Sequence, residues 1–105
     1  MLEKDLVKSC LEYLGWKKIF HYRSNTGAFK TDAGGFYRFG SVGCPDIISV
    51  IKGQYVGIEC KVNKNPQSPA QKEFQKNLES AGGKYLLIRS VDELVDELEK
   101  LTHKI

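Results

Sequence analysis

Two strand patterns joined by a very short loop constrain the fold of this chain more than any other feature. Residues 46–52 and 55–62 are both rich in apolar and β-branched side chains, and only Gly53 and Gln54 separate them. Glycine at the first central position of a two-residue loop suits a type II′ turn. The sequence therefore predicts an antiparallel hairpin over these residues.

Side chains alternate along the second strand of this hairpin and divide into two groups. The apolar group, which must face a core, consists of Val56, Ile58, Cys60 and Val62. Glu59 and Lys61 share the opposite face. The two-residue loop pairs Lys52 with Tyr55 and so places Asp46 opposite Lys61, on the face of Glu59. A three-residue loop would move Asp46 to the other face unless a bulge restored it.

The convergence of Asp46, Glu59 and Lys61 predicts a metal-dependent hydrolytic site. Two neighbouring carboxylates repel each other unless a cation lies between them, and such oxygen ligands suit Mg²⁺ or Mn²⁺. The ion would polarise a phosphodiester and lower the pKa of a bound water. A lysine beside it could position or deprotonate that water, or neutralise charge on the phosphate. The alternative is an Asp–Lys ion pair on a solvated strand face, because E-x-K alone is a weak motif.

Glu3 and Gln71 are conditional additions to this site. Glu3 lies on the apolar face of the first predicted helix, where an acid is costly to bury unless it is paired or binds a metal. The alternative is a frayed first turn with Glu3 in water, which the helix dipole favours. Gln71 shares a helical face with Leu78 and so points toward the sheet, but it also occupies the third helical position of a capping box begun by Ser68.

The remaining patterns predict a single α/β domain over residues 1–105, a mixed sheet flanked by helices. Helices are expected at 2–14, at 69–81 and after Ser90, and further strands at 18–24, 36–39 and 84–89. Gly15 is placed to end the first helix. The second helix lies between two strands as a β-α-β unit, so these strands should be parallel with a right-handed crossover.

A glycine-rich stretch over residues 25–43 offers groups that bind a nucleic-acid backbone. We expect Arg23, Asn25, Lys30 and Arg38 to contact phosphate, beside backbone amides that glycine leaves accessible. The net charge of +3 is unevenly distributed, with bases concentrated early and acids in the last helix, which suggests a polyanionic partner at one side. The alternative is an ordinary solvated loop on a mixed surface.

The sequence also suggests a cellular compartment. No apolar run approaches the ~20 residues of a membrane span, and the charged N-terminus does not read as a signal peptide. Cys10, Cys44 and Cys60 are widely spaced, which argues against structural zinc and for free thiols in a reducing compartment. We expect a cytoplasmic protein of a bacterial cell or a phage-infected host.

Three short motifs follow one another along the chain: G-x-P-D at 43–46, E-x-K at 59–61, and a glutamine early in the next helix, Gln71. In this order and spacing they resemble the PD-(D/E)xK nuclease superfamily. The narrower resemblance is to the virus-type replication–repair nuclease domain, VRR-Nuc, in its small stand-alone form. It spans nearly the whole chain and implies a restriction-endonuclease-like core with the element order α-β-(β)-β-β-α-β-α.

The resemblance also implies roles for individual residues. Asp46 and Glu59 would bind Mg²⁺ or Mn²⁺, with the carbonyl of Cys60 joining them, and Lys61 would be the catalytic lysine. The family's first-helix acid would be Glu3, near the metal directly or through water.

In the same family, the glutamine at the position of Gln71 would support the site or the DNA. Stand-alone members resemble dimeric junction-resolving enzymes. A homodimer that cuts branched DNA, such as a four-way junction, is therefore expected.

Three hypotheses of function follow. The leading one is a Mg²⁺- or Mn²⁺-dependent DNA endonuclease. The second is a non-catalytic nucleic-acid-binding module that retains the nuclease fold, suggested by the basic glycine-rich stretch. The third is a protein-interaction subunit that uses the last helix, although packing on the sheet would already bury the apolar stripe of that helix.

Overall fold

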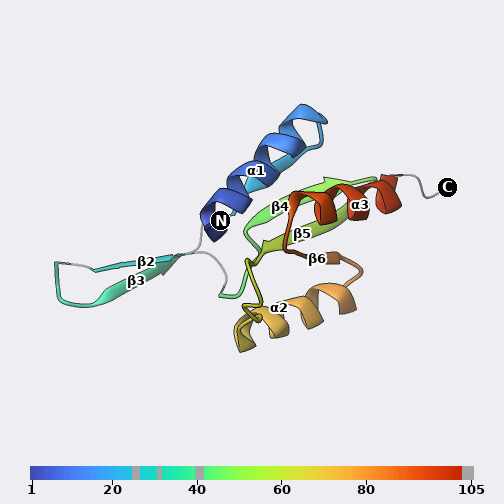
Figure 1. Ribbon diagram of the computed structural model, residues 1–105. Helices are drawn as coiled ribbons and strands as arrows, with labels where there is room; N and C mark the ends of the chain where they lie inside the picture. Colours follow the sequence, from blue (N-terminus) through green and yellow to red (C-terminus); the bar gives the residue numbers. More distant parts are fainter. Residues whose placement is uncertain (25–26, 31, 40–41, 103–105) are drawn as a thin grey trace.

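The computed structural model describes residues 1–24, 27–30, 32–39 and 42–102, with the backbone alone for 27–30 and 36–39. Its elements in chain order are α1 (Glu3–Trp16), β1 (His21–Arg23), β2 (Gly27–Lys30), β3 (Phe36–Phe39), β4 (Ile47–Ile51), β5 (Gln54–Cys60), α2 (Pro69–Ser80), β6 (Lys84–Ile88) and α3 (Val91–Thr102) (Figure 1). None of the helices in this described part has the length and apolar character needed to span a membrane.

Four strands form one mixed sheet in the order β1-β4-β5-β6. β1, β4 and β5 pair antiparallel, whereas β5 and β6 pair parallel across the α2 crossover, as predicted. The predicted strand β3 is present, but its antiparallel partner β2 was not expected from the sequence. Figure 1 shows this β2–β3 ribbon projecting away from the rest of the molecule.

Helices lie on both faces of the sheet. In Figure 1, α1 and α3 lie above it and α2 lies below. The apolar sides of α1, α3 and the sheet enclose the core, whose buried members include Leu6, Cys10, Leu14, Ile47, Val56, Ile58, Cys60, Ile88, Leu94 and Leu98. The predicted alternation of the second hairpin strand is therefore confirmed, since three of its four apolar side chains are fully buried in this core.

The hairpin turn differs from the prediction. Ile51 pairs with Gln54, so the two central residues are Lys52 and Gly53, with φ of 52° and 80°. Two positive φ values define a type I′ turn, whose twist matches that of the flanking strands. The expected type II′ turn and the pairing of Lys52 with Tyr55 were wrong, because Lys52 adopts the left-handed conformation and its ammonium donates to the Thr102 carbonyl at 2.7 Å.

This correction shifts the pairing by two residues and leaves the faces unchanged, since an even shift preserves alternation. Ile47 pairs with Ile58. Asp46, the residue before β4, therefore lies beside Glu59 rather than opposite Lys61. The two carboxylates meet on one face, closer together than the sequence suggested, and the place of the Lys61 side chain beside them stays a prediction.

The first helix also ends later than predicted. Gly15 remains helical, α1 continues to Trp16, and Lys18 takes the left-handed conformation with φ of 59°. The amide of Ile19 donates to the carbonyl of Leu14 at 3.0 Å and closes this end. The strand expected from residue 18 therefore begins only at His21.

Two glycines allow the segment before β4 to fit between α2 and β5. Gly43 has a φ of 79°, and a Cβ there would collide with the carbonyl of Ala70 in the first turn of α2. A Cβ on Gly57 would lie 2.6 Å from Cγ of Pro45. These close approaches hold the segment that leads into Asp46 against both elements.

We expect Gly43→Ala to destabilise the protein more than Gly53→Ala. Both glycines have φ near 80°, but Gly53 has open space around its Cα. Both substitutions carry the left-handed backbone strain of ~1–2 kcal/mol. Only the first adds a collision with α2, which costs a further ~1–3 kcal/mol. Urea unfolding measures the difference, and equal losses would contradict the proposed packing.

Candidate functional site

Three carboxylates from separate elements meet at the end of the sheet where β4 begins and β5 ends. Glu3, Asp46 and Glu59 each place a carboxylate oxygen within 4.8 Å of the other two. Glu3 is the first residue of α1, so the N-terminus of this helix reaches the site. Of the two interpretations of Glu3, the structure favours the one in which it joins the other acids.

Glu59 is the most constrained member of this carboxylate cluster. Its side chain is 2% exposed, and its Oε2 accepts a hydrogen bond from Nε2 of Gln71 at 3.1 Å. Its Oε1 is buried with no hydrogen-bond partner among the described residues. Burial, followed by the charge of Asp46, raises the pKa of Glu59 to about 8. An orphaned carboxylate oxygen of this kind favours binding either a proton or a cation.

Asp46 is held by the backbone of β5 and by an arginine. Its Oδ2 accepts a hydrogen bond from the amide of Cys60 at 2.9 Å. Nη1 of Arg23 lies 3.5 Å from its Oδ1 and donates to its carbonyl oxygen at 2.7 Å. The Arg23 side chain, predicted to bind nucleic acid, is 46% exposed and so lies at the rim of the cluster.

Gln71 combines the two roles that the sequence left open. Its backbone amide donates to Oγ of Ser68 at 3.1 Å. Its side-chain Oε1 accepts from the backbone amide of Ser68 at 2.8 Å, which completes the capping box. Because its Oε1 is engaged in this way, its Nε2 is directed at Glu59. The cap therefore orients the amide that holds the buried carboxylate.

Lys61 and Cys60 contribute to the site in different ways. Lys61 directly follows β5, and its charge lowers the pKa of Glu59 against the effect of burial. The thiol of Cys60 lies in the core, with its Sγ 3.9 Å from Sγ of Cys10. Only the backbone of Cys60 reaches the site. Its amide, which the sequence analysis did not single out, orients Asp46, and the expected role of its carbonyl stays a prediction.

The structure places the backbone of two further predicted nucleic-acid ligands, Lys30 and Arg38, in the β2–β3 ribbon. Asn25 is outside the described residues. Lys30 and Arg38 lie on β2 and β3, but their side chains are also outside the described part. Their contacts with nucleic acid remain predictions.

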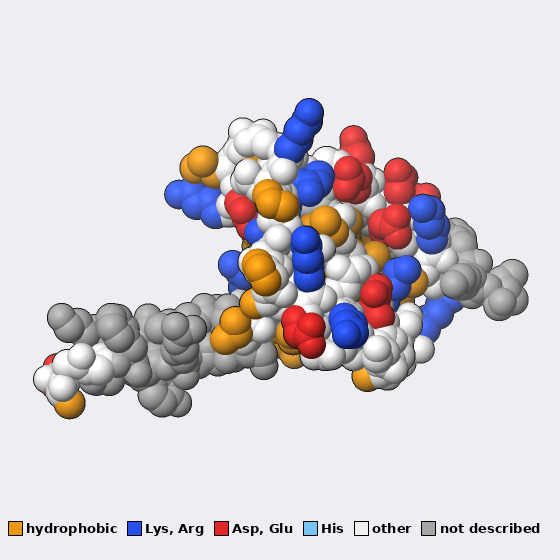
Figure 2. All heavy atoms as spheres, turned by 90° about the horizontal axis from the view of Figure 1, so that it is seen from below, with side chains coloured by type: hydrophobic (Ala, Val, Ile, Leu, Met, Phe, Trp, Pro, Cys, Tyr) orange, Lys and Arg blue, Asp and Glu red, His pale blue; other side chains and the backbone are white. Residues whose placement is uncertain are grey.

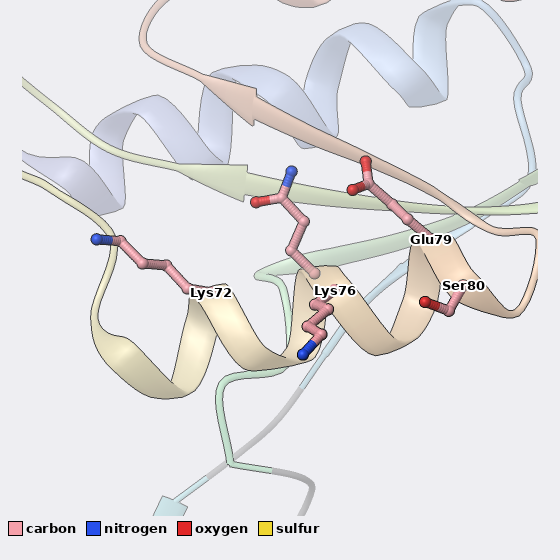
Figure 3. Close-up of a pocket in the computed structure, with 5 residues that line it drawn as sticks. Lys72, Lys76, Glu79 and Ser80 are labelled. Atoms are coloured by element: carbon pink, nitrogen blue, oxygen red, sulfur yellow. The ribbon is translucent and has the colours of Figure 1, made fainter.

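A separate hollow of about 480 Å³ lies along α2, lined by Lys72, Gln75, Lys76, Glu79 and Ser80. None of these residues belongs to the carboxylate cluster. Figure 3 shows Lys72 and Lys76 extending from the helix in different directions. Their ammonium groups therefore do not converge on one ligand position, and this hollow is not the candidate site.

Acidic side chains gather in one region of the surface, whereas the predicted basic end stays a prediction. Figure 2 shows the molecule from the side of α2, with acidic side chains most crowded in one region at the upper right. The acids that the sequence concentrates in α3 are Asp92, Glu93, Asp96, Glu97 and Glu99. Lysine and arginine side chains are distributed over the whole of this view, including beside the acids.

No protein-family model matches the chain, and no curated protein matches it. Function is therefore inferred from the cluster itself. Three carboxylates with one orphaned buried oxygen are a donor set that fits a hard divalent cation such as Mg²⁺ or Mn²⁺. A lysine directly after β5 and an arginine at the rim suit a substrate with negative charge.

The raised pKa of Glu59 predicts that the metal-free protein loses stability as the pH rises. The ordinary pKa of this carboxyl is 4.5, and folding raises it to about 8. Its protonated form therefore contributes stability that is complete below about pH 4.5 and is lost as the pH rises through about 8. Thermal unfolding in chelator between pH 5 and 9 should show this fall in wild type and a smaller one in Glu59→Gln. Parallel curves for the two proteins would show that Glu59 does not titrate with a raised pKa.

Proposed function

We propose that this chain is a Mg²⁺- or Mn²⁺-dependent nuclease that hydrolyses DNA phosphodiester bonds. The observation that carries the proposal is the orphaned Oε1 of Glu59 inside a cluster of three carboxylates. A buried carboxylate with a hydrogen bond to only one of its two oxygens destabilises a protein unless a ligand binds the other oxygen. A divalent cation would do so.

The arrangement of the elements supports membership of the PD-(D/E)xK superfamily and its VRR-Nuc branch. G-x-P-D leads into β4, E-x-K lies at the end of β5, and Gln71 lies in the first turn of α2. A mixed sheet with helices on both faces is compatible with the restriction-endonuclease-like core that we propose.

In this proposal the carboxylate cluster binds the metal and Lys61 acts on the attacking water or the phosphate. Glu3, Asp46 and Glu59 would hold the metal, together with the carbonyl of Cys60. The bound ion would polarise the phosphodiester and lower the pKa of an attacking water. Lys61 would position that water or neutralise charge that develops on the phosphate.

The surrounding groups would keep these ligands in place. The backbone amide of Cys60 donates to one carboxylate oxygen of Asp46 and orients it, and Gln71 orients Glu59. Arg23, at the rim, would bind a neighbouring phosphate as well as contacting Asp46. Preorganisation of this kind lowers the reorganisation required during the reaction.

The substrate and assembly are further parts of the same proposal. Branched DNA, such as a four-way junction, and a homodimeric enzyme rest on the resemblance to stand-alone VRR-Nuc domains. A cytoplasmic place of action, in a bacterial cell or a phage-infected host, would give access to such DNA.

We expect Asp46→Asn and Lys61→Met each to reduce Mn²⁺-dependent cleavage of DNA by a factor of ~100 or more. The first weakens a metal ligand, and the second removes the lysine ammonium. Cleavage of labelled four-way junctions and linear duplexes, with and without Mn²⁺, measures the effect. Lys72→Met is the matched control, because Lys72 lines the hollow on α2 and should leave the rate unchanged.

Cleavage that survives either substitution would refute the nuclease proposal. Salt-dependent DNA binding that is indifferent to Mn²⁺ and to Glu59→Gln would instead favour the non-catalytic binding module.

Ser68→Ala and Gln71→Ala separate helix capping from support of the metal site. Both remove the capping box and should cost ~0.5–2 kcal/mol in urea unfolding. Only Gln71→Ala also removes the donor to Glu59, and a supporting contact of this type changes metal affinity by ~10–100-fold. Calorimetric titration with Mn²⁺ should therefore show a much weaker site in Gln71→Ala than in Ser68→Ala. Equal affinities would exclude a supporting role for Gln71.

A further inference from the structure

The sheet face that carries Asp46 and Glu59 is covered by α2 over only part of its width. α2 packs near β5 and β6, where Leu78 lies close to Gly57. On the β1–β4 side, the same face exposes apolar side chains. Phe20 is 64% exposed, Tyr22 52% and Val50 42%.

Strand pairing places these three residues together on that face. Tyr22 pairs with Ile48, so its side chain lies on the face shared by alternate residues of β4, including Val50 and Asp46. Phe20 lies two residues before Tyr22, and its carbonyl accepts a hydrogen bond from Oγ of Ser49 at 2.7 Å, which ties it to β4. The ring centroids of Phe20 and Tyr22 are 6.3 Å apart, with the ring planes inclined by 70°. We call Phe20, Tyr22 and Val50 the aromatic platform.

A chain of contacts connects the aromatic platform to the carboxylate cluster. Tyr55 pairs with Val50 and lies near Tyr22 and Cys44, and burial, together with these neighbours, raises its pKa to about 12. Sγ of Cys44 lies 3.1 Å from Oγ of Ser24. The amide of Ser24 in turn donates to the carbonyl of Asp46 at 2.9 Å. A run of contacting residues therefore connects the platform to the carboxylate cluster.

The chemistry of this surface favours nucleic acid over a protein partner. Exposed aromatic rings stack on bases whatever the sequence, and basic groups beside them bind the phosphates. The Arg23 guanidinium contacts Asp46 of the cluster, and Lys18 lies two residues before Phe20 in the chain. A purely apolar protein partner would offer no negative charge to these basic side chains.

We propose that Phe20 and Tyr22 stack on unpaired bases of a DNA strand whose phosphate lies at the carboxylate cluster. Base faces are hidden in a continuous duplex, so the substrate carries unpaired nucleotides next to the bond that is cut. The inclined rings present their faces in different directions, which suits two splayed bases of a bent strand. The choice of substrate rests on the proposed nuclease function, but the stacking contact does not require cleavage.

Equilibrium binding in chelator tests the platform separately from catalysis. The probes are a fluorescent oligothymidylate and a blunt duplex of the same length. Phe20→Leu and Tyr22→Leu keep an apolar side chain but remove the ring, and each should weaken binding of the single strand by about 5-fold or more. Binding of the duplex should change little. Thermal unfolding should be nearly unchanged, since both side chains are exposed.

Two control variants sharpen this test. Tyr22→Phe keeps the ring and should bind the single strand like wild type. Trp16→Leu removes a ring that is even more exposed, on α1, the helix that covers the opposite sheet face, and should also have no effect. Unchanged single-strand binding in both platform variants, or an equal loss in Trp16→Leu, would overturn the proposal.

The outcomes distinguish this inference from the nuclease proposal. Ring-dependent binding of the single strand by a protein that never cleaves DNA would retain the platform and refute the nuclease. The opposite outcome is cleavage that requires Asp46 and in which the leucine variants cut nicked and gapped DNA as fast as wild type. This result would retain the nuclease and refute the platform. If the leucine variants bind DNA normally but lose self-association in sedimentation, the surface is a contact between copies and the stacking proposal fails.

Discussion

β4 and β5 pair around the turn at Lys52 and Gly53, and this pairing sorts the side chains of both strands. On one face, Ile47 and Ile58 enter the core beneath α1 and α3. On the other face, Asp46 comes beside Glu59 at the end of the sheet. A slip by one residue would move the core residues to the other face and turn the acids into the apolar core, so the core and the carboxylate cluster require the same register.

The cluster itself is an electrostatic compromise. Glu59 is buried with one oxygen orphaned, next to Asp46, whose charge opposes its ionisation. The fold tolerates this because Gln71 donates to Glu59 and because Gly43 allows the first turn of α2 to approach closely. Such a group reduces stability in the absence of a ligand, and this cost is characteristic of sites that bind cations or move protons.

One sheet face combines two kinds of surface. Its end, where β4 begins and β5 ends, carries Asp46 and Glu59, and its open side carries the aromatic platform formed by Phe20, Tyr22 and Val50. A DNA strand has both parts that these surfaces would bind, the charged phosphodiester backbone and the flat bases. The proposed enzyme would therefore select DNA by whether bases are free to stack, as well as by the phosphate that its metal site engages.

Much of the fold and site follows from residue type and spacing. The alternation from Val56 to Val62 indicated which face is core, and Ser68 with Gln71 marked the start of α2. The parallel pairing of β5 and β6 followed from the β-α-β order. Strand β2 was missed because the glycine-rich stretch has little β-branched or alternating character.

The sequence by itself determined the faces, because alternation is a property of every strand and an even slip does not alter it. Only the tertiary structure decided that Asp46 lies beside Glu59 rather than Lys61, because this depends on the left-handed backbone of Lys52 in the turn. Only the tertiary structure brought Glu3 to the cluster and joined the cap of α2 to Glu59 through Gln71. These contacts connect residues far apart in the chain, and their geometry depends on how helices pack against the sheet, which local patterns do not encode.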